Sequence, residues 1–237
     1  MATYLEQSLA KLKEFEGCVP WMYRDTVGRV TVGVGLMLPD VAAARALEFT
    51  TAGALASAEQ IESEFARVMA LPEARPASFY KVASSPELPE SAVDGKLIAV
   101  LEAFERVLRE RLNGYDSMPQ TAKLALLDMA YNLGPEGLFR EYPRMMEAVG
   151  VGAWAKAAGE CLRHGPGPVR NAWTKAMFLD AAAGGEIAAV SARAEGWLSG
   201  IWRKVRRFGA TSDGEPAVGP AGLHVRWRQV ARKLRDR

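Results

Sequence analysis

The sequence has 237 residues, of which 49% are hydrophobic and 24% are charged. That length allows one large domain or two small ones, and that composition excludes a mainly disordered chain. No run of about 18 apolar residues occurs, which excludes a transmembrane helix. The formal net charge of +2 is unevenly distributed, because residues 202–237 form a basic tail with ten Lys or Arg against three Asp or Glu, leaving 20 basic and 25 acidic residues elsewhere.

The two cysteines, Cys18 and Cys161, are too few for a disulfide framework, and no cluster of further ligands accompanies them. We therefore expect both thiols to be reduced, and we expect neither a metal nor a cofactor. The first 16 residues carry charges where a secretory signal needs an apolar core. We accordingly expect synthesis in the cytoplasm without a signal peptide.

The N-terminal segment is predicted to be an amphipathic helix. Apolar residues recur at spacings of four, three and three from Leu5 to Phe15, which places them on one helical face. Glu16 and Gly17 follow where this helix should end, and glycine is the usual terminator.

The next segment predicts a β-hairpin. Trp21 and Tyr23 alternate before the turn sequence RDTVGR, after which three valines alternate with Thr31, Gly33 and Gly35. Because a strand sends successive side chains to opposite faces, Thr31 should share its face with the two glycines while the valines pack on the other. The bare face could let a ligand approach the backbone, or the glycines could mark a bulged or sharply twisted strand.

The middle and the second half of the chain are predicted to be mainly helical. Residues 57–69 form the clearest helix of an alanine-rich stretch, and the proline-rich residues 71–90 should be irregular. Further helices are expected at residues 91–113, 119–134, 151–163, 168–183 and 186–199.

The expected helix 119–134 is apolar on almost every side, which predicts that it passes through the centre of a core. Asp128 should there be hydrogen bonded to buried partners, because buried polar groups need them. Asn132 lies near the helix end and could equally face a cleft.

Two carboxylates of the N-terminal segment fit the chemistry of glycosidic bond cleavage. That reaction needs one carboxylic acid to protonate the leaving oxygen, and a second carboxylate that activates or positions water or attacks directly. The acid must keep its proton near neutral pH, which favours a partly buried position. Glu16 has uncharged sequence neighbours and is the better acid, whereas Asp25 belongs to a polar turn where ionisation costs little.

Glu16, Asp25 and Thr31 follow one another at intervals of nine and six positions, within a helix end, a hairpin and a Thr-x-Gly-x-Gly pattern. This arrangement resembles the glutamate, aspartate and threonine triad of the phage-type (T4-like) lysozymes, a muramidase family of glycoside hydrolases. The segment LLDMAYNLG is similar to the family's central hydrophobic helix, and VRNAWTKAMFL to its later arginine-rich segment. Together the similar segments cover about residues 5–36 and 118–183.

This resemblance implies an α+β, predominantly α-helical fold with two lobes, as in lysozymes. A catalytic domain at residues 1–200 would contain a small lobe with the hairpin around 17–70 and a helical lobe around 91–200. The basic tail, 201–237, would follow it. The sugar chain would lie between the lobes.

The resemblance also implies roles for individual residues. Glu16 would be the general acid, Asp25 would position or activate the attacking species, and Thr31 would hold the catalytic water, with inversion at the anomeric centre. The bond cut would be the β-1,4 bond between N-acetylmuramic acid and N-acetylglucosamine in peptidoglycan. The residues expected to bind the substrate are Tyr23, Gly33, Gly35, Asn132 and Arg170.

One departure from the family pattern is Leu36, which follows the second glycine where the family commonly has histidine. This change puts in doubt any salt-bridge support that the histidine gives to the larger lobe, and the pH dependence of the activity. The two histidines present, His164 and His224, receive no catalytic role.

Other functions remain open on the sequence. The protein could be a non-catalytic peptidoglycan-binding module of the same fold, or a hydrolase of a related polymer such as chitin. The basic tail could bind nucleic acid, hold the protein near an anionic bacterial envelope, or simply be a solvated end helix. Lytic transglycosylation is disfavoured, because that reaction can dispense with a positioned water.

The partner expected from the resemblance is the glycan strand of peptidoglycan, reached in the periplasm or cell wall of a host or target bacterium. Delivery would depend on a phage holin, a phage tail or an injection system for antibacterial effectors. In the last case an immunity protein would be a second partner. We expect no nucleic-acid partner and no integral membrane contact.

Overall fold

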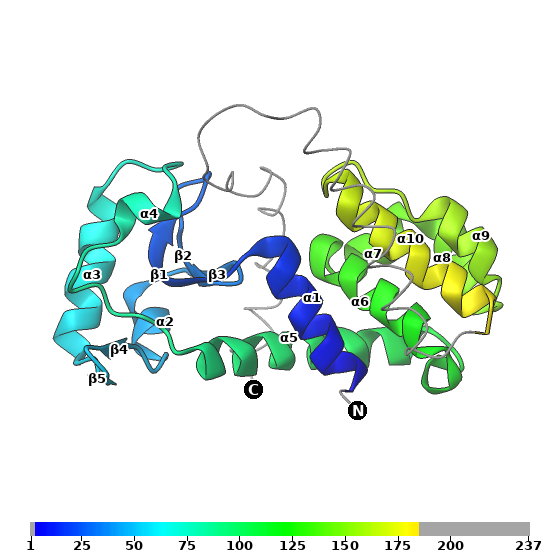
Figure 1. Ribbon diagram of the computed structural model, residues 1–237, viewed down its shortest axis with the longest axis horizontal. Coiled ribbons are helices and arrows are strands. Elements are labelled where there is room, and N and C mark those ends of the chain that lie inside the picture. The colour runs from blue at the N-terminus through cyan, green and yellow to red at the C-terminus, as the bar shows by residue number, and fades with distance from the viewer. Residues whose placement is uncertain (1–2, 185–237) are drawn as a thin grey trace, which may run out of the picture. The chain divides into compact units, whose positions relative to one another are not determined.

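The structure, a computed structural model, describes residues 3–184 and is predominantly helical (Figure 1). The described residues contain ten α-helices and two small antiparallel sheets. The α+β, mainly helical fold class expected from the sequence is thereby confirmed. The basic tail and the helix expected at 186–199 lie outside the described residues.

The described chain divides into two compact units, one formed by residues 9–100 and the other by residues 3–8 with 101–184. Two helices, α1 (Tyr4–Glu16) and α5 (Glu90–Arg111), contribute residues to both units. The small lobe expected around 17–70 lies wholly inside the unit of residues 9–100.

The unit of residues 9–100 is built around a three-stranded antiparallel sheet in the order β1-β2-β3. Its strands are β1 (Val19–Arg24), β2 (Val30–Gly33) and β3 (Leu36–Leu38). The remaining elements are α2 (Val41–Arg45), β4 (Thr50–Thr51), β5 (Ala54–Leu55), α3 (Ala58–Ala70) and α4 (Ala77–Tyr80). The predicted hairpin is present, and its second strand is the central strand of the sheet.

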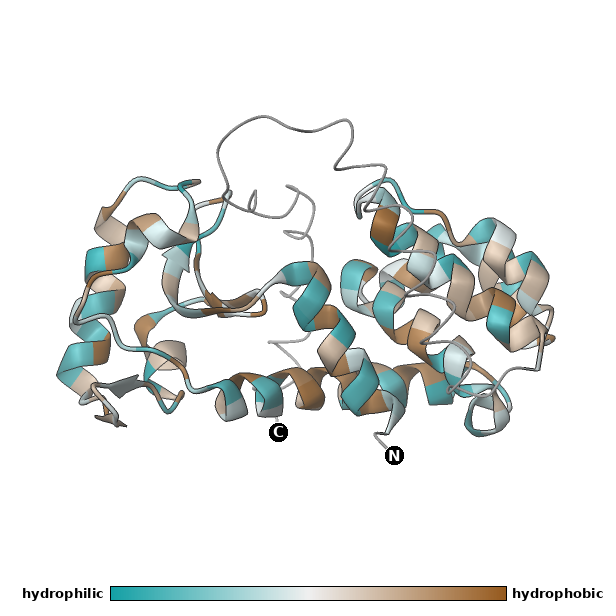
Figure 2. Ribbon diagram, in the orientation of Figure 1, coloured by the Kyte–Doolittle hydropathy of each residue, from teal (hydrophilic) through white to brown (hydrophobic). Residues whose placement is uncertain are grey.

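Helix α3 covers the sheet by packing against β1 and β2. It begins with a capping box, in which Ser57 accepts a hydrogen bond from the Gln60 N–H and Gln60 accepts one from the Ser57 N–H. Figure 2 shows hydrophilic and hydrophobic residues alternating along this helix, as expected for an amphipathic helix at a core boundary. Val68 of α3 is buried, as are Val30 and Val32 of the sheet, so the predicted apolar face of the hairpin forms part of the core.

The predicted second strand is too long by two residues. It ends at Gly33, and Val34 and Gly35 form a turn into β3, a strand that the sequence pattern did not reveal. Gly33 and Gly35 both have positive φ, +65° and +76°, which bends the chain there. Leu36, directly after this turn, pairs with Val32 across β2 and β3.

Gly33 is also a point of close packing. A Cβ at this position would lie 3.2 Å from a methyl carbon of Val93 in α5, within the same unit. We expect Gly33→Ala to lower the free energy of unfolding by about 3 kcal/mol, from left-handed backbone strain plus overpacking. Gly53→Ala is the matched control, because Gly53 has φ +82° with open space around it and should cost only about 1–2 kcal/mol. Urea denaturation of both variants measures the difference, and equal losses would rule out the packing contribution.

The unit formed by residues 3–8 and 101–184 is entirely helical. Its elements after α5 are a short 3₁₀ helix (Tyr115–Ser117), α6 (Gln120–Leu133), α7 (Pro135–Glu141), α8 (Pro143–Gly150), α9 (Trp154–Glu160) and α10 (Pro168–Ala182). Helix α6 is buried along almost its whole length and α10 packs against it, which confirms the predicted central helix. The helix predicted at 151–163 is shorter, and α7 and α8 were not predicted.

Candidate active site

The three residues predicted to be catalytic all lie in the unit of residues 9–100. Glu16 is the last residue of α1, Asp25 follows β1, and Thr31 lies in β2. The helix ends at Glu16 because Gly17 has φ +73°, and its N–H closes the last turn by donating to the Lys13 carbonyl at 3.0 Å.

Lys13 fixes the end of α1 that carries Glu16. Its ammonium group donates to Glu90 at 2.5 Å and to Asp94 at 2.7 Å, and both carboxylates belong to the part of α5 in the same unit. These hydrogen bonds, together with the nearby charges, raise the pKa of Lys13 above its ordinary value. The last turn of α1 is therefore held against α5 by a charged group that remains protonated at neutral pH.

Asp25 is held by the turn that joins β1 to β2. Its Oδ1 accepts hydrogen bonds from the backbone N–H groups of Val27 at 2.9 Å and Arg29 at 2.8 Å. Its own N–H donates to the Arg29 carbonyl, and Gly28, with φ +79°, closes the turn onto the Asp25 carbonyl. The turn sequence therefore orients the carboxylate through backbone contacts.

Thr31 lies on the central strand and is only 4% exposed. Its direct cross-strand neighbours are Tyr23 on β1 and Met37 on β3, so all three side chains share one face of the sheet. The Thr31 hydroxyl donates to the Arg29 carbonyl at 3.4 Å, which is long for a hydroxyl donor. Leu36 pairs with Val32, one residue further along β2, and therefore belongs to the opposite face from Thr31.

The Tyr23 phenol is influenced by the charges of both candidate carboxylates. Burial raises the pKa of its phenol to about 12, and the negative charges of Asp25 and Glu16 contribute to the same shift. Both carboxylates thus act electrostatically on one side chain, which lies beside Thr31 on the sheet face. At neutral pH the phenol stays protonated and is available as a hydrogen-bond donor.

The two glycines predicted to contact substrate have structural reasons to be glycine. Gly33 is buried and faces Val93, so part of the face expected to be bare is filled by α5. Gly35 belongs to the β2–β3 turn and needs its positive φ. Their predicted contact with substrate stays a prediction.

Asn132 and Arg170, also predicted to bind substrate, belong to the other unit. Asn132 is the penultimate residue of α6 and is half-buried. Arg170 lies in the first turn of α10 and is only 6% exposed. Their participation in the same site as Glu16 stays a prediction.

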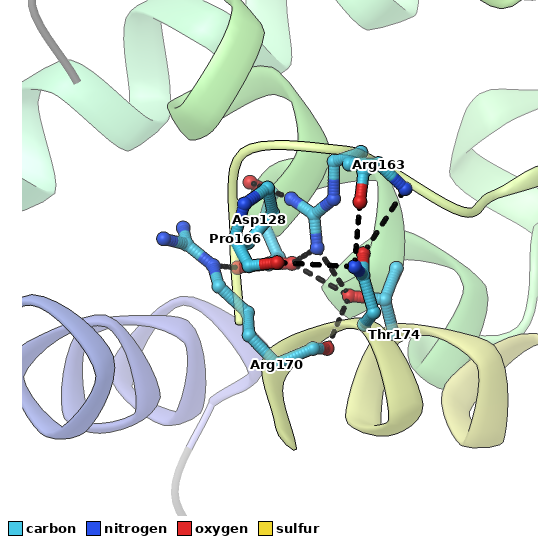
Figure 3. A network of polar contacts seen from close by, with 6 residues as sticks. Asp128, Arg163, Pro166, Arg170 and Thr174 are labelled. Carbon is cyan, nitrogen blue, oxygen red and sulfur yellow. Dashed lines mark hydrogen bonds and ion pairs between the residues drawn. The ribbon is translucent and has the colours of Figure 1, made fainter. Parts of the chain in front are cut away.

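Arg170 is part of a buried network centred on Asp128 (Figure 3). Asp128 is 3% exposed and accepts from Arg170 Nε at 2.7 Å, from an Arg163 guanidinium nitrogen at 2.6 Å, and from the Thr174 hydroxyl at 2.7 Å. Figure 3 shows the two guanidinium groups approaching the carboxylate from different sides. The predicted structural role of Asp128 is confirmed.

The electrostatics of this network favour the ionised carboxylate. Burial alone would raise the pKa of Asp128, but the charges of Arg170 and Arg163 outweigh it and lower the pKa below its ordinary value. The network joins α6 to α10 and to the segment between α9 and α10 that carries Arg163. Nothing in the sequence indicated that Arg163 belongs to this network. Arg170 and Thr174 are four residues apart on α10 and so share a helical face, which is a pattern visible in the sequence.

Residues 3–184 contain neither a metal-binding group of side chains nor a helix able to cross a membrane. No group of three or more His, Cys, Asp or Glu side chains in this range is placed to hold a metal ion. None of the helices in the same range has the length and apolar character needed to cross a membrane.

Comparison with protein-family models and with curated proteins found no match for this sequence.

Proposed function

We propose that the protein is a muramidase that hydrolyses the β-1,4 bond between N-acetylmuramic acid and N-acetylglucosamine in peptidoglycan. The observation that supports this proposal is the placement of Thr31 beside Tyr23 on the sheet, with Asp25 in the turn that joins their strands and Glu16 at the end of α1 in the same unit. The negative charges of both carboxylates contribute to the raised pKa of the Tyr23 phenol. Thr31 lies directly across from Tyr23 on the neighbouring strand. Most glycoside hydrolases cleave the glycosidic bond with a pair of carboxyl groups, and a hydroxyl beside them is suited to position the attacking water.

In the proposed reaction Glu16 gives its proton to the leaving glycosidic oxygen. Asp25 positions or activates the water that attacks the sugar, and the backbone contacts to its Oδ1 keep the carboxylate oriented for this task. The Thr31 hydroxyl, with one long hydrogen bond to the backbone, is suited to hold that water.

Thr31→Val tests the proposed water-holding hydroxyl. Valine keeps the β-branched shape in β2, and the bond that it removes is long, so we expect the thermal unfolding midpoint to stay within a few degrees of wild type. We expect kcat on purified peptidoglycan to fall about a hundredfold, the lower end of the range for a lost proton-transfer or water-positioning group.

Thr31→Ser is the matched control, because it keeps the hydroxyl and should retain most of the activity. Muropeptide release measured by chromatography gives kcat for all three proteins. Full activity in the valine variant would remove Thr31 from the mechanism.

A further inference from the structure

Arg29 places a positive charge that has no ion-pair partner among residues 3–184 on the sheet face that carries Thr31. Its guanidinium Nη1 lies 3.2 Å from the sulfur of Met37, which is the direct cross-strand partner of Thr31. The guanidinium therefore reaches from the end of the turn to the position of the Thr31–Met37 pair. A thioether is a weak acceptor and does not compensate the charge.

The other basic side chains of residues 9–100 are either paired or exposed. Six of the nine Lys and Arg side chains there form ion pairs with carboxylates of the same unit: Lys11, Lys13, Arg24, Arg45, Arg67 and Lys81. Arg75 and Lys96 are exposed to water. Arg29 is half-buried and, within the described part of the chain, forms no ion pair.

Among the described residues, the carboxylate of Asp25 contacts the backbone of Arg29 and forms no ion pair with its guanidinium group. Asp25 Oδ1 accepts from the backbone N–H of Arg29, so the side chain of Arg29 is left to extend along the sheet toward Met37. A half-buried guanidinium beside a substrate site has five N–H donors and prefers a carboxylate or phosphate with which it can form two parallel hydrogen bonds.

We propose that Arg29 binds a carboxylate of the substrate and makes the site selective for charged glycan strands. This inference rests on the proposed function and names its specificity. Every muramic acid of peptidoglycan has a lactyl ether that ends in a carboxyl group. This carboxyl group is either free or joined by an amide bond to a peptide, and the peptide has carboxylates of its own. A polymer of N-acetylglucosamine alone has no carboxylate. Arg29 thus favours peptidoglycan over chitin-like polymers.

The test compares wild type, Arg29→Met and Arg45→Met on three substrates. These are intact peptidoglycan, glycan strands stripped of peptides so that the lactyl carboxylates are free, and uncharged N-acetylglucosamine oligomers. Methionine keeps the apolar stem of Arg29 without its charge. Arg45 is the matched control, because it is an arginine of the same unit whose charge pairs with Glu62 at 3.0 Å on the protein surface.

We expect Arg29→Met to lower kcat/KM about tenfold on a carboxylate-bearing substrate and to leave cleavage of the uncharged oligomers unchanged. A loss on stripped strands assigns the contact to the lactyl carboxylate, and a loss on intact peptidoglycan alone assigns it to the peptide. Arg45→Met should match wild type on all three. An equal loss on charged and uncharged substrates, or no loss on any of them, would overturn the proposal.

A binding measurement separates this inference from the proposed hydrolysis. If wild type cleaves none of the three substrates, the muramidase proposal fails, and co-sedimentation with insoluble peptidoglycan and with chitin then decides the role of Arg29. Weaker retention of Arg29→Met than of Arg45→Met on peptidoglycan, with equal retention on chitin, would support the carboxylate contact. Equal retention of the two variants on peptidoglycan would exclude it.

Discussion

Replacing Glu16 by Gln is expected to lower kcat for peptidoglycan hydrolysis about a thousandfold. The amide has nearly the shape of the protonated acid but cannot give a proton to the leaving glycosidic oxygen, and such groups typically contribute 10² to 10⁴ in rate. Binding of the glycan strand should change little, because the loss acts on the transition state. Release of soluble muropeptides at saturating substrate measures kcat, and co-sedimentation measures binding.

The same helix supplies a matched control for this substitution. Glu14 lies two residues before Glu16 on α1, is exposed and pairs with Lys11. Glu14→Gln removes one carboxylate from the same turn and should leave kcat within about twofold of wild type, because exposed ion pairs contribute little. Similar activity of the Glu16 and Glu14 variants would contradict the assignment of Glu16 as the acid.

Asp128→Asn is expected to have the largest effect on stability, lowering the free energy of unfolding by about 3–5 kcal/mol. The substitution keeps the shape of the side chain but removes the negative charge that two buried guanidinium groups, of Arg163 and Arg170, contact. These arginines are 2% and 6% exposed, so water can compensate little of the loss. Urea denaturation followed by circular dichroism gives the difference.

The control for Asp128 is Asp116→Asn in the same unit. Asp116 is 71% exposed and pairs with Arg109 at 2.8 Å, so its loss should cost less than about 1 kcal/mol. Equal stability of the two variants would show that the buried network contributes no more than a surface ion pair.

The pH dependence of unfolding is a second measure of how much the ionised Asp128 stabilises the fold. The pKa of Asp128 is lower in the folded state than in the unfolded state, where it is about 3.9. The ionised carboxylate therefore stabilises the fold fully above that unfolded pKa, and this stabilisation is lost as the pH falls through the folded pKa. Wild type should therefore lose stability more steeply below about pH 4 than Asp128→Asn does. Parallel pH profiles of the two proteins would argue against an ionised Asp128 in the fold.

The elements that the sequence predicted well have strong local signals. Helix α1 has a regular apolar spacing and ends at Gly17, and α3 begins at the Ser57 capping box. The turn between β1 and β2 follows from Asp25 and Gly28, whose backbone contacts close it. These features depend on residues a few positions apart, and for that reason the sequence pattern was sufficient to find them.

The elements that were missed are short or depend on distant residues. Strand β3 has only three residues, Leu36–Leu38, and its glycine-rich turn looks like a continuation of β2. Helices α7 and α8 have Pro135 and Pro143 in their first turns, and a proline in a sequence can mark either the start of a helix or its end. The contact between Gly33 and Val93 joins residues 60 positions apart and has no local pattern.

The candidate site could be predicted in part for the same reason. Glu16, Asp25 and Thr31 lie within one short segment, so a motif was enough to bring them to attention. The shared sheet face of Tyr23 and Thr31 depends on strand register, which contains an irregularity between Val19 and Tyr23 that alternation alone does not show. The reach of Arg29 to Met37 likewise depends on β3 and became visible only in the folded chain.

Mass spectrometry of borohydride-reduced products from purified peptidoglycan tests the central proposal most directly. A muramidase creates new reducing ends on N-acetylmuramic acid, which borohydride converts to muramitol. We predict muramitol-containing muropeptides with wild type and at least a hundredfold fewer with Glu16→Gln. New reducing ends on N-acetylglucosamine, anhydro-muropeptides, or equal product from the two proteins would contradict hydrolysis by this site.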